Sequence, residues 1–177
     1  MTLLINGSAA SSSTNGNFLQ ALSKRYTSAS ELQIYPTEGL LHLPLYSPDI
    51  DQPDQLSQSV LNWRSSVSRA QSVILSTPVY IYNIPALLKN ALEWLTTSGE
   101  LYGKPVFVFT YTPHPPRGDK AMASLIPSLQ ALNAQILGQC QLYQSELFIR
   151  DNFDLEGEES IVLLDEAMSM LGHNKLS

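Results

Sequence analysis

A hydroxyl-rich segment, residues 7–15, is the part of this sequence best suited to holding an anion. It reads Gly-Ser-Ala-Ala-Ser-Ser-Ser-Thr-Asn and stands between a short apolar run and a helical pattern that opens near Thr14. The first N–H groups of a helix are unpaired and its dipole favours negative charge, so the segment suits a phosphate monoester. An ordinary helix cap followed by a polar loop explains the same residues equally well. With a single glycine and no Gly-Lys-Ser/Thr, the segment is neither a dinucleotide fingerprint nor a Walker loop.

A second segment, residues 77–85, places two tyrosines, Tyr80 and Tyr82, between Pro78 and Pro85. It follows an apolar run and leads into a helical pattern, where Pro85 suits the first helical turn. A rigid aromatic ledge at the end of a strand could carry a flat heteroaromatic ring. The alternative is a pair of tyrosines that only cap the edge of the core.

Other chemistries have weaker support in the sequence. The three histidines, His42, His114 and His173, are too scattered to suggest a metal cluster. Ser8, His114 and Asp119 could form a hydrolytic triad, but no G-x-S-x-G elbow exposes the serine. An obvious general acid–base pair is also missing, which is expected where a bound cofactor carries the chemistry.

Composition narrows the class of protein. The 177 residues suit a single domain, and 44% hydrophobic against 15% charged residues excludes a disordered chain. A net charge of −6 argues against nucleic acid as a partner. The single Cys140 excludes an intrachain disulfide and suits a reducing cytoplasm. With no signal peptide and no apolar run near the ~20 residues of a membrane span, we expect a soluble cytoplasmic protein formed by residues 1–177 as one domain, with no membrane partner.

Two alternating periodicities indicate the elements that must position these segments. Runs of apolar, β-branched and aromatic residues predict strands over residues 2–6, 31–35, 72–77, 104–110 and, weakly, 139–143. Amphipathic spacing predicts helices from Thr14 to Tyr26 and over residues 56–67, 84–95, 121–132 and 160–171. The alternation predicts a three-layer α/β fold, a five-stranded parallel sheet with helices on both faces. Ligands of such sheets lie beyond the carboxyl ends of the strands, so the loops after the first, third and fourth strands are the expected site.

Three further segments carry their own expectations. Pro127 predicts a kink or a late start in the fourth helix. Residues 36–53 form one long irregular connection, and such loops are usually functional or pack on themselves. Residues 151–166 carry seven acids and no base, which indicates a solvated helix face.

Taken together, the two motifs resemble the NADPH-dependent FMN reductase family, which has a flavodoxin-like fold. The family's first loop reads Gly-Ser-x-Arg-x-x-Ser-x-Asn, and its second motif reads Thr-Pro-Glu-Tyr-Asn, a short variable stretch and Pro-Gly-x-Leu-Lys-Asn-Ala-x-Asp-Trp. The resemblance extends over roughly residues 1 to 145, with the second motif the more specific. The matching residues are Gly7, Ser8, Ser13 and Asn15 in the first motif, and Thr77, Pro78, Tyr80, Pro85, Leu88, Lys89, Asn90, Ala91 and Trp94 in the second.

The resemblance implies an FMN-dependent oxidoreductase that takes hydride from NADPH or NADH. Its second substrate would be a small-molecule electron acceptor such as a flavin, a quinone, an azo dye or a metal ion. We expect at least one of Arg117 and Lys120 to contact the nucleotide, although both also suit solvated positions at a helix start. The cofactor-binding residues implied are Ser8, Ser13, Thr14 and Asn15 for the phosphate, and Pro78, Val79, Tyr80, Ile81, Thr112 and Pro113 for the ring.

Departures from the family pattern lead to an alternative function. The loop arginine is Ala10, so we expect weaker flavin retention, because charge-assisted hydrogen bonds are about twice as strong as neutral ones. Val79 and Ile81 replace the acid and the amide of the second motif. Three prolines stand in the loop at residues 112–118, where the family has glycines. The alternative is a flavodoxin-like binding or interaction module with weak or no flavin turnover.

The helix expected over residues 84–95 also predicts a homodimer or homotetramer. Its apolar residues cover an arc of roughly 160°, wider than the ~100° needed to pack on a sheet. The excess apolar surface, at Leu92 or Trp94, must be buried against something other than the sheet. A second copy of the chain would provide the covering surface, and proteins of this family commonly pair. The competing explanation is that the loop at residues 36–53 folds over the helix within one chain.

Overall fold

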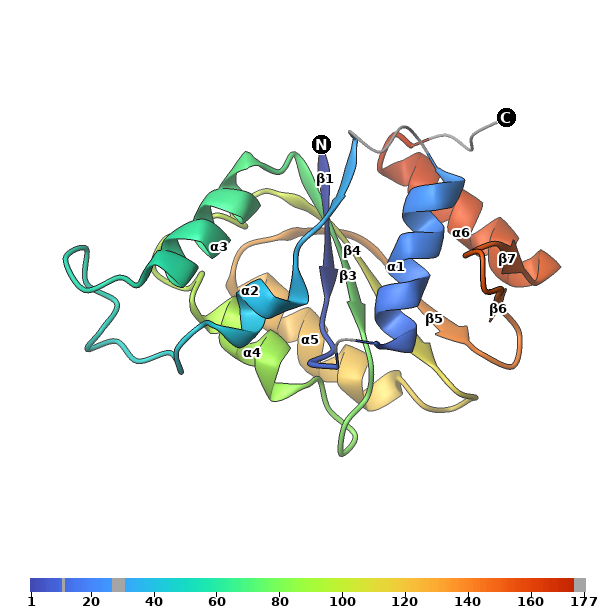
Figure 1. The fold of residues 1–177 in the computed structure, drawn as a ribbon, viewed down its shortest axis with the longest axis horizontal. Helices are drawn as coiled ribbons and strands as arrows, with labels where there is room; N and C mark the ends of the chain where they lie inside the picture. Colours follow the sequence, from blue (N-terminus) through green and yellow to red (C-terminus); the bar gives the residue numbers. More distant parts are fainter. Residues whose placement is uncertain (11, 27–30, 174–177) are drawn as a thin grey trace.

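The computed structural model describes residues 1–10, 12–26 and 31–173, and within them five parallel strands form one sheet (Figure 1). Their order, β2-β1-β3-β4-β5, is that of the flavodoxin fold and confirms the predicted class. The strands are β1 (Thr2–Asn6), β2 (Leu32–Ile34), β3 (Ser72–Thr77), β4 (Pro105–Thr112) and β5 (Gln135–Tyr143).

Helices cover both faces of the sheet because side chains alternate along each buried strand. In β1, Leu3 and Ile5 pack into one apolar cluster and Leu4 into the other. The first cluster lies under α3 (Gln58–Arg69), α4 (Ala86–Glu93) and α5 (Asp119–Ala131). The second lies under α1 (Thr14–Arg25) and α6 (Glu158–Met170), which run side by side in Figure 1.

The predicted bounds of the strands and helices agree with the structure to within about two residues, except at the start of β5. β5 begins at Gln135 rather than Gln139, and its pairing with β4 starts at Pro105. Its outer positions are glutamines at an edge strand, so it lacks the continuous apolar run that marks a buried strand. The late start of α5 at Pro127 is wrong: the helix begins at Asp119, and Pro127 is exposed inside it, where buried Leu125 and Leu129 hold the helix on either side.

Three small elements were missed by the sequence prediction. A short helix, α2 (Thr37–Leu41), interrupts the long connection, and β6 (Phe148–Ile149) pairs antiparallel with β7 (Leu155–Glu156). The acids of segment 151–166 are exposed or half-buried, as expected of a solvated face. The second half of the segment belongs to α6, which buries Ser160 and Leu164 on one side while its carboxylates line the other.

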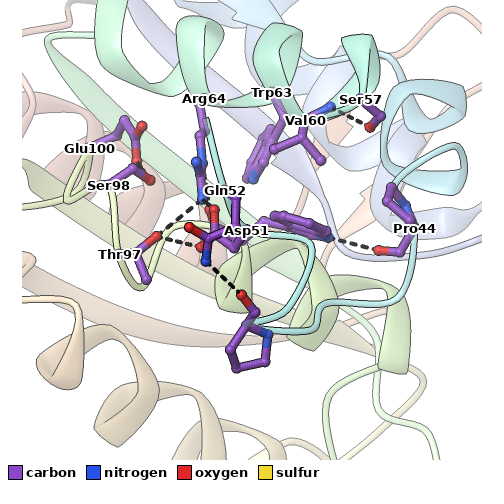
Figure 2. A network of polar contacts seen from close by, with 12 residues as sticks. Pro44, Asp51, Gln52, Ser57, Val60, Trp63, Arg64, Thr97, Ser98 and Glu100 are labelled. Atoms are coloured by element: carbon purple, nitrogen blue, oxygen red, sulfur yellow. Dashed lines mark hydrogen bonds and ion pairs between the residues drawn. The ribbon is translucent and has the colours of Figure 1, made fainter. Parts of the chain in front are cut away.

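The connection between α2 and α3 folds over α4, as the competing explanation predicted. The indole Nε1 of Trp94 donates to the carbonyl of Pro44 at 2.7 Å, and the ring of Tyr46 meets Trp94 edge-on at 5.2 Å. Figure 2 shows how Arg64 holds this connection through Asp51, with an ion pair of 2.7 Å. Leu92 and Trp94 are therefore buried within one chain, at 3% and 1% exposure, and need no partner. The apolar surface of α4 is therefore no evidence for a second copy of the chain.

Candidate active site

The loops that follow β1, β3 and β4 meet at the carboxyl edge of the sheet and line a cleft of about 410 Å³. This is the location expected for a doubly wound sheet. The size suits a small-molecule ligand. Of the ten residues proposed from the sequence, nine line this cleft and Ile81 lines a neighbouring one. The nine are Ser8, Ser13, Thr14, Asn15, Pro78, Val79, Tyr80, Thr112 and Pro113.

Ser13 serves as the cap of α1. Its Oγ accepts from the backbone N–H of Gly16 at 3.0 Å and from Nδ2 of Asn6 at 3.1 Å. The capping interpretation of the sequence is therefore correct for this side chain. A cap satisfies only some of the free N–H groups at a helix start, and Thr14 and Asn15 of the first turn line the cleft.

Asn15 ties the first turn of α1 to the sheet. The side chain is buried; its Nδ2 donates to the carbonyl of Tyr111 at 3.1 Å, and its Oδ1 accepts from Oγ of Ser76 at 2.8 Å. Both partners lie on strands, so the amide joins α1 to β3 and β4. This geometry assigns Asn15 to holding the loop in place rather than to direct contact with a ligand.

Ser8 joins the first loop to the second. Its Oγ lies 3.2 Å from the hydroxyl of Tyr80 and accepts from the N–H of Ala10 at 3.2 Å. A hydrolytic triad is absent among the described residues, because His114 and Asp119 line the neighbouring cleft and Nδ1 of His114 contacts the carbonyl of Pro115. In this loop, Ser12 and Thr14 are the exposed hydroxyl residues that line the cleft.

The second loop turns back sharply after Tyr80. The backbones of Tyr80 and Asn83 bond to each other in both directions at 2.9 Å, and the two residues between them have left-handed φ angles. These angles, 50° at Ile81 and 57° at Tyr82, suit Asn or Gly far better than a β-branched side chain. The tight turn points Ile81 away from the first cleft, which is why it was misplaced from the sequence.

The third loop is fixed by its ends. Oγ1 of Thr112 donates to the carbonyl of Arg117 at 3.1 Å, and Gly118 adopts a φ of 122° at the start of α5. A Cβ at Gly118 would lie 2.8 Å from Oγ1 of Thr110, a buried hydroxyl without a hydrogen-bond partner in the described structure. Arg117 lines both clefts, and Nζ of Lys120 lies 4.9 Å from the ring centre of Tyr82.

Sequence reasoning missed Tyr111 and Gln144, which complete the wall of the first cleft. The alternation of Phe107, Phe109 and Tyr111 along β4 could have extended the predicted strand and revealed the first of them. Burial raises the pKa of Tyr111 to about 12, so the phenol stays protonated at neutral pH. Burial also raises the pKa of Cys140 to about 11, which keeps it a thiol rather than a reactive thiolate.

Neither a metal centre nor a membrane span is found among the described residues. Their histidines, cysteine and carboxylates form no group of three that could hold a metal ion. Their helices, likewise, are too short or too polar to cross a bilayer.

Comparison with known proteins shows which family the chain resembles. Residues 1–146 match the family model for NADPH-dependent FMN reductases. A quinone reductase of Escherichia coli is 30% identical over 141 residues, covering 78% of this chain and 73% of that protein. The NADH:(hydroxy)cinnamate reductase subunit CrdA of Vibrio ruber is 36% identical over 107 residues, covering 60% of this chain but only 50% of the relative's length.

The fold is shared with solved flavoenzymes. The NAD(P)H:acceptor oxidoreductase FerB of Paracoccus denitrificans superposes with a TM-score of 0.71 at 22% identity, covering 92% of this chain and 90% of its own. Because the family model covers most of the sequence, the chain belongs to the NADPH-dependent FMN reductase family. The predicted family and flavodoxin-like fold are confirmed, and the oxidoreductase type is the one its relatives' names state.

Proposed function

We propose that the chain binds FMN in the cleft between its three loops and uses NADPH or NADH to reduce a small acceptor such as a quinone or a flavin. One observation carries this proposal. Hydroxyls and helix amides line one end of a cleft whose other walls are proline, valine and tyrosine. A phosphate suits the polar end and a planar ring suits the rest. The family match and the names of the quinone and flavin reductase relatives support the same reaction.

The polar end would hold the phosphate through neutral groups. The hydroxyls of Ser12 and Thr14 and the first-turn amides of α1 supply the donors, while Ser8, Ser13 and Asn15 hold the loop in shape. No guanidinium is available at position 10, where the residue is alanine. We therefore expect FMN to be bound more weakly than in family members that carry arginine there.

The apolar end would frame the flavin ring. Pro78 and Val79 on one side and Thr112 and Pro113 on the other restrict the ring and exclude water. FMN, when bound, supplies the redox chemistry, because it accepts hydride from a nicotinamide and passes two electrons on. For a quinone acceptor, one hydride from the nucleotide and one proton from solvent give the hydroquinone.

Two cations would attract the anionic nucleotide to a chain of net charge −6. Arg117 and Lys120 line the second cleft beside the proposed ring site, and both are exposed. If they contact the nucleotide, the double variant R117A/K120A raises the Michaelis constant for NADPH. An unchanged Michaelis constant for NADPH would show that neither side chain contacts the nucleotide.

Binding and bleaching measurements test the function. The purified protein should bind FMN more tightly than riboflavin in a fluorescence titration, and its colour should bleach anaerobically on adding NADPH or NADH. In S12A/T14A, FMN affinity should fall about thirtyfold with riboflavin unaffected, at ~1 kcal/mol for each of the two lost hydrogen bonds. S65A, an exposed serine on α3, is the matched control. Equal affinity for FMN and riboflavin would overturn the phosphate site, and a bound flavin that does not bleach would favour the binding-module alternative.

Assembly and location also remain proposals. We propose a homodimer or homotetramer on family resemblance alone, since the helix surface first held to need a partner is covered by Pro44 and Tyr46. Light scattering at micromolar concentration tests it, and a mass of 19.6 kDa would refute it. We also propose a cytoplasmic location from the single cysteine, and a tagged chain in cell fractions would test that.

A further inference from the structure

A second cleft of about 460 Å³ opens beside the first, between the turn after β3 and the loop after β4. The two clefts share Val79 and Arg117 as lining residues, so a ligand in one lies next to a ligand in the other. The second cleft combines two features that differ in chemistry: an exposed apolar and aromatic wall, and a pair of unpaired cations.

The apolar wall exposes large hydrophobic side chains to water, and its backbone is strained. Ile81 is 97% exposed and Tyr82 is 72% exposed, although both are large and hydrophobic. Both also hold left-handed φ angles, which a β-branched residue such as Ile81 rarely adopts. The paired backbone bonds between Tyr80 and Asn83 fix this arrangement. Backbone strain of this kind clusters at active sites and ligand clamps.

The cations in this cleft have no charged partner. Among the described lysines and arginines, only Arg69, Arg117 and Lys120 make neither an ion pair nor a side-chain hydrogen bond. Arg69 lies at the end of α3, on the opposite edge of the sheet from the cleft, whereas the other two line it together. Asp119 is the acid at this cleft, so its lining carries one net positive charge in a chain of −6.

The cation and the aromatic ring lie close enough to act on one ligand. Nζ of Lys120 lies 4.9 Å from the ring centre of Tyr82, a cation–π distance. A planar ring could therefore stack against Tyr82 and Ile81 while a negative substituent reaches Arg117 and Lys120. A neutral ring would gain the stacking alone.

We propose that this cleft is the acceptor subsite, and that Arg117 and Lys120 select planar aromatic acceptors that carry a negative charge, such as quinones that bear a sulfonate or a carboxylate. The proposal rests on the proposed reductase function and specifies its acceptor. The nucleotide's phosphates would use the same cations first. Once oxidised nucleotide leaves, the bare cations are available to the acceptor. For a quinone the balance is NADPH, a proton and quinone giving NADP⁺ and hydroquinone.

A pair of matched acceptors tests the selection. The anionic 1,4-naphthoquinone-2-sulfonate and the neutral 2-methyl-1,4-naphthoquinone are compared by kcat/KM at saturating NADPH in the FMN-loaded protein. We expect the ratio of kcat/KM for the sulfonate to kcat/KM for the neutral quinone to fall about tenfold in R117Q/K120Q. R69Q, which removes an unpaired cation outside the cleft, should keep the preference. In the unmodified protein the preference should shrink at ~0.5 M salt, where the Debye length falls to a few ångströms.

A binding measurement separates failure of the inference from failure of the proposed function. Fluorescence of 2-naphthoate, compared with that of 2-naphthol, reports binding at the cleft with no turnover. Tighter binding of naphthoate that is lost in R117Q/K120Q supports the charge selection. Equal binding of the two probes, or a sulfonate preference unchanged in R117Q/K120Q, overturns it. If NADPH bleaches no flavin and neither quinone is reduced, the proposed function itself fails, whatever naphthoate does.

Discussion

The two adjoining clefts differ in how far their lining side chains already have bonding partners within the protein. In the first, the side chains of Ser8, Ser13 and Asn15 are each bonded within the protein. In the second, Ile81 is strained and exposed, and Arg117 carries no counter-charge among the described residues. Because its side chains are hydrogen-bonded within the protein, the first cleft is a rigid frame that offers a ligand backbone groups and a few free hydroxyls. In the second cleft, the exposed apolar and charged side chains remain available to a ligand. We therefore expect substitutions in the first cleft to change stability, and substitutions in the second cleft to change selectivity.

Breaking the frame at Asn15 gives the largest expected effect. Asn15→Leu keeps the volume but leaves Ser76 Oγ and the carbonyl of Tyr111 unpaired in the interior. At ~1–3 kcal/mol for each unsatisfied buried group, we expect the free energy of unfolding to fall by about 3 kcal/mol in urea titrations, and FMN affinity to fall with it. Asn17→Leu, an exposed neighbour on α1, should change stability by less than about 0.5 kcal/mol. Equal losses in both variants would show that Asn15 is no frame residue.

The boundary between the clefts can be tested at Gly118. Gly118→Ala combines a φ of 122° with a Cβ only 2.8 Å from Oγ1 of Thr110, so we expect a loss of about 2 kcal/mol in thermal or urea unfolding. Gly99→Ala has a φ of 75° and nothing within 4 Å of its Cβ, so it isolates the backbone strain, at about 1 kcal/mol. If the two variants lose equal stability, the close packing at Gly118 contributes nothing.

The stability of the protein at alkaline pH tests the contribution of the buried Tyr111. Its folded pKa, about 12, lies above the ordinary value of about 10 because the ring is buried. The raised value means that the tyrosine's contribution is intact below pH 10 and is lost as the pH rises toward 12. At pH 11 this loss is about 1 kcal/mol. Tyr111→Phe should show a correspondingly smaller decline between pH 9 and pH 11 in urea unfolding, and an identical decline would place the titration elsewhere.

The second cleft should respond in the opposite direction. Ile81→Asn relieves left-handed strain and removes an exposed apolar side chain, so we expect stability to rise by about 0.5–1 kcal/mol. The kcat/KM for naphthoquinone acceptors should fall, because the stacking wall is lost. Ile81→Val keeps the β-branch and should show no gain. A stability gain without any change in kcat/KM would separate the strain from acceptor binding.

Much of the fold was determined by local sequence pattern. β1 and β3 were predicted to the residue, because continuous apolar runs at the centre of a parallel sheet leave little ambiguity. β5 was predicted short and α2 was missed, because an edge strand of glutamines and a five-residue helix have little periodicity to detect. The order of strands and loops also placed nine of ten proposed residues around one cleft, since loops at the same edge of a sheet must converge.

Only the tertiary structure decided what those residues do. The sequence could not separate a capping serine from a phosphate ligand, since one hydroxyl suits both; the bonds of Ser13 to Gly16 and Asn6 assign it to the cap. It could not decide whether a second chain or residues 36–53 covered Trp94, because an apolar side chain does not specify which apolar surface covers it. The hydrogen bond from Trp94 to Pro44 shows that residues of the same chain cover it. Nor could the sequence show that Ile81 leaves the first cleft. That depends on a turn closed by backbone bonds between Tyr80 and Asn83, which no side-chain pattern records.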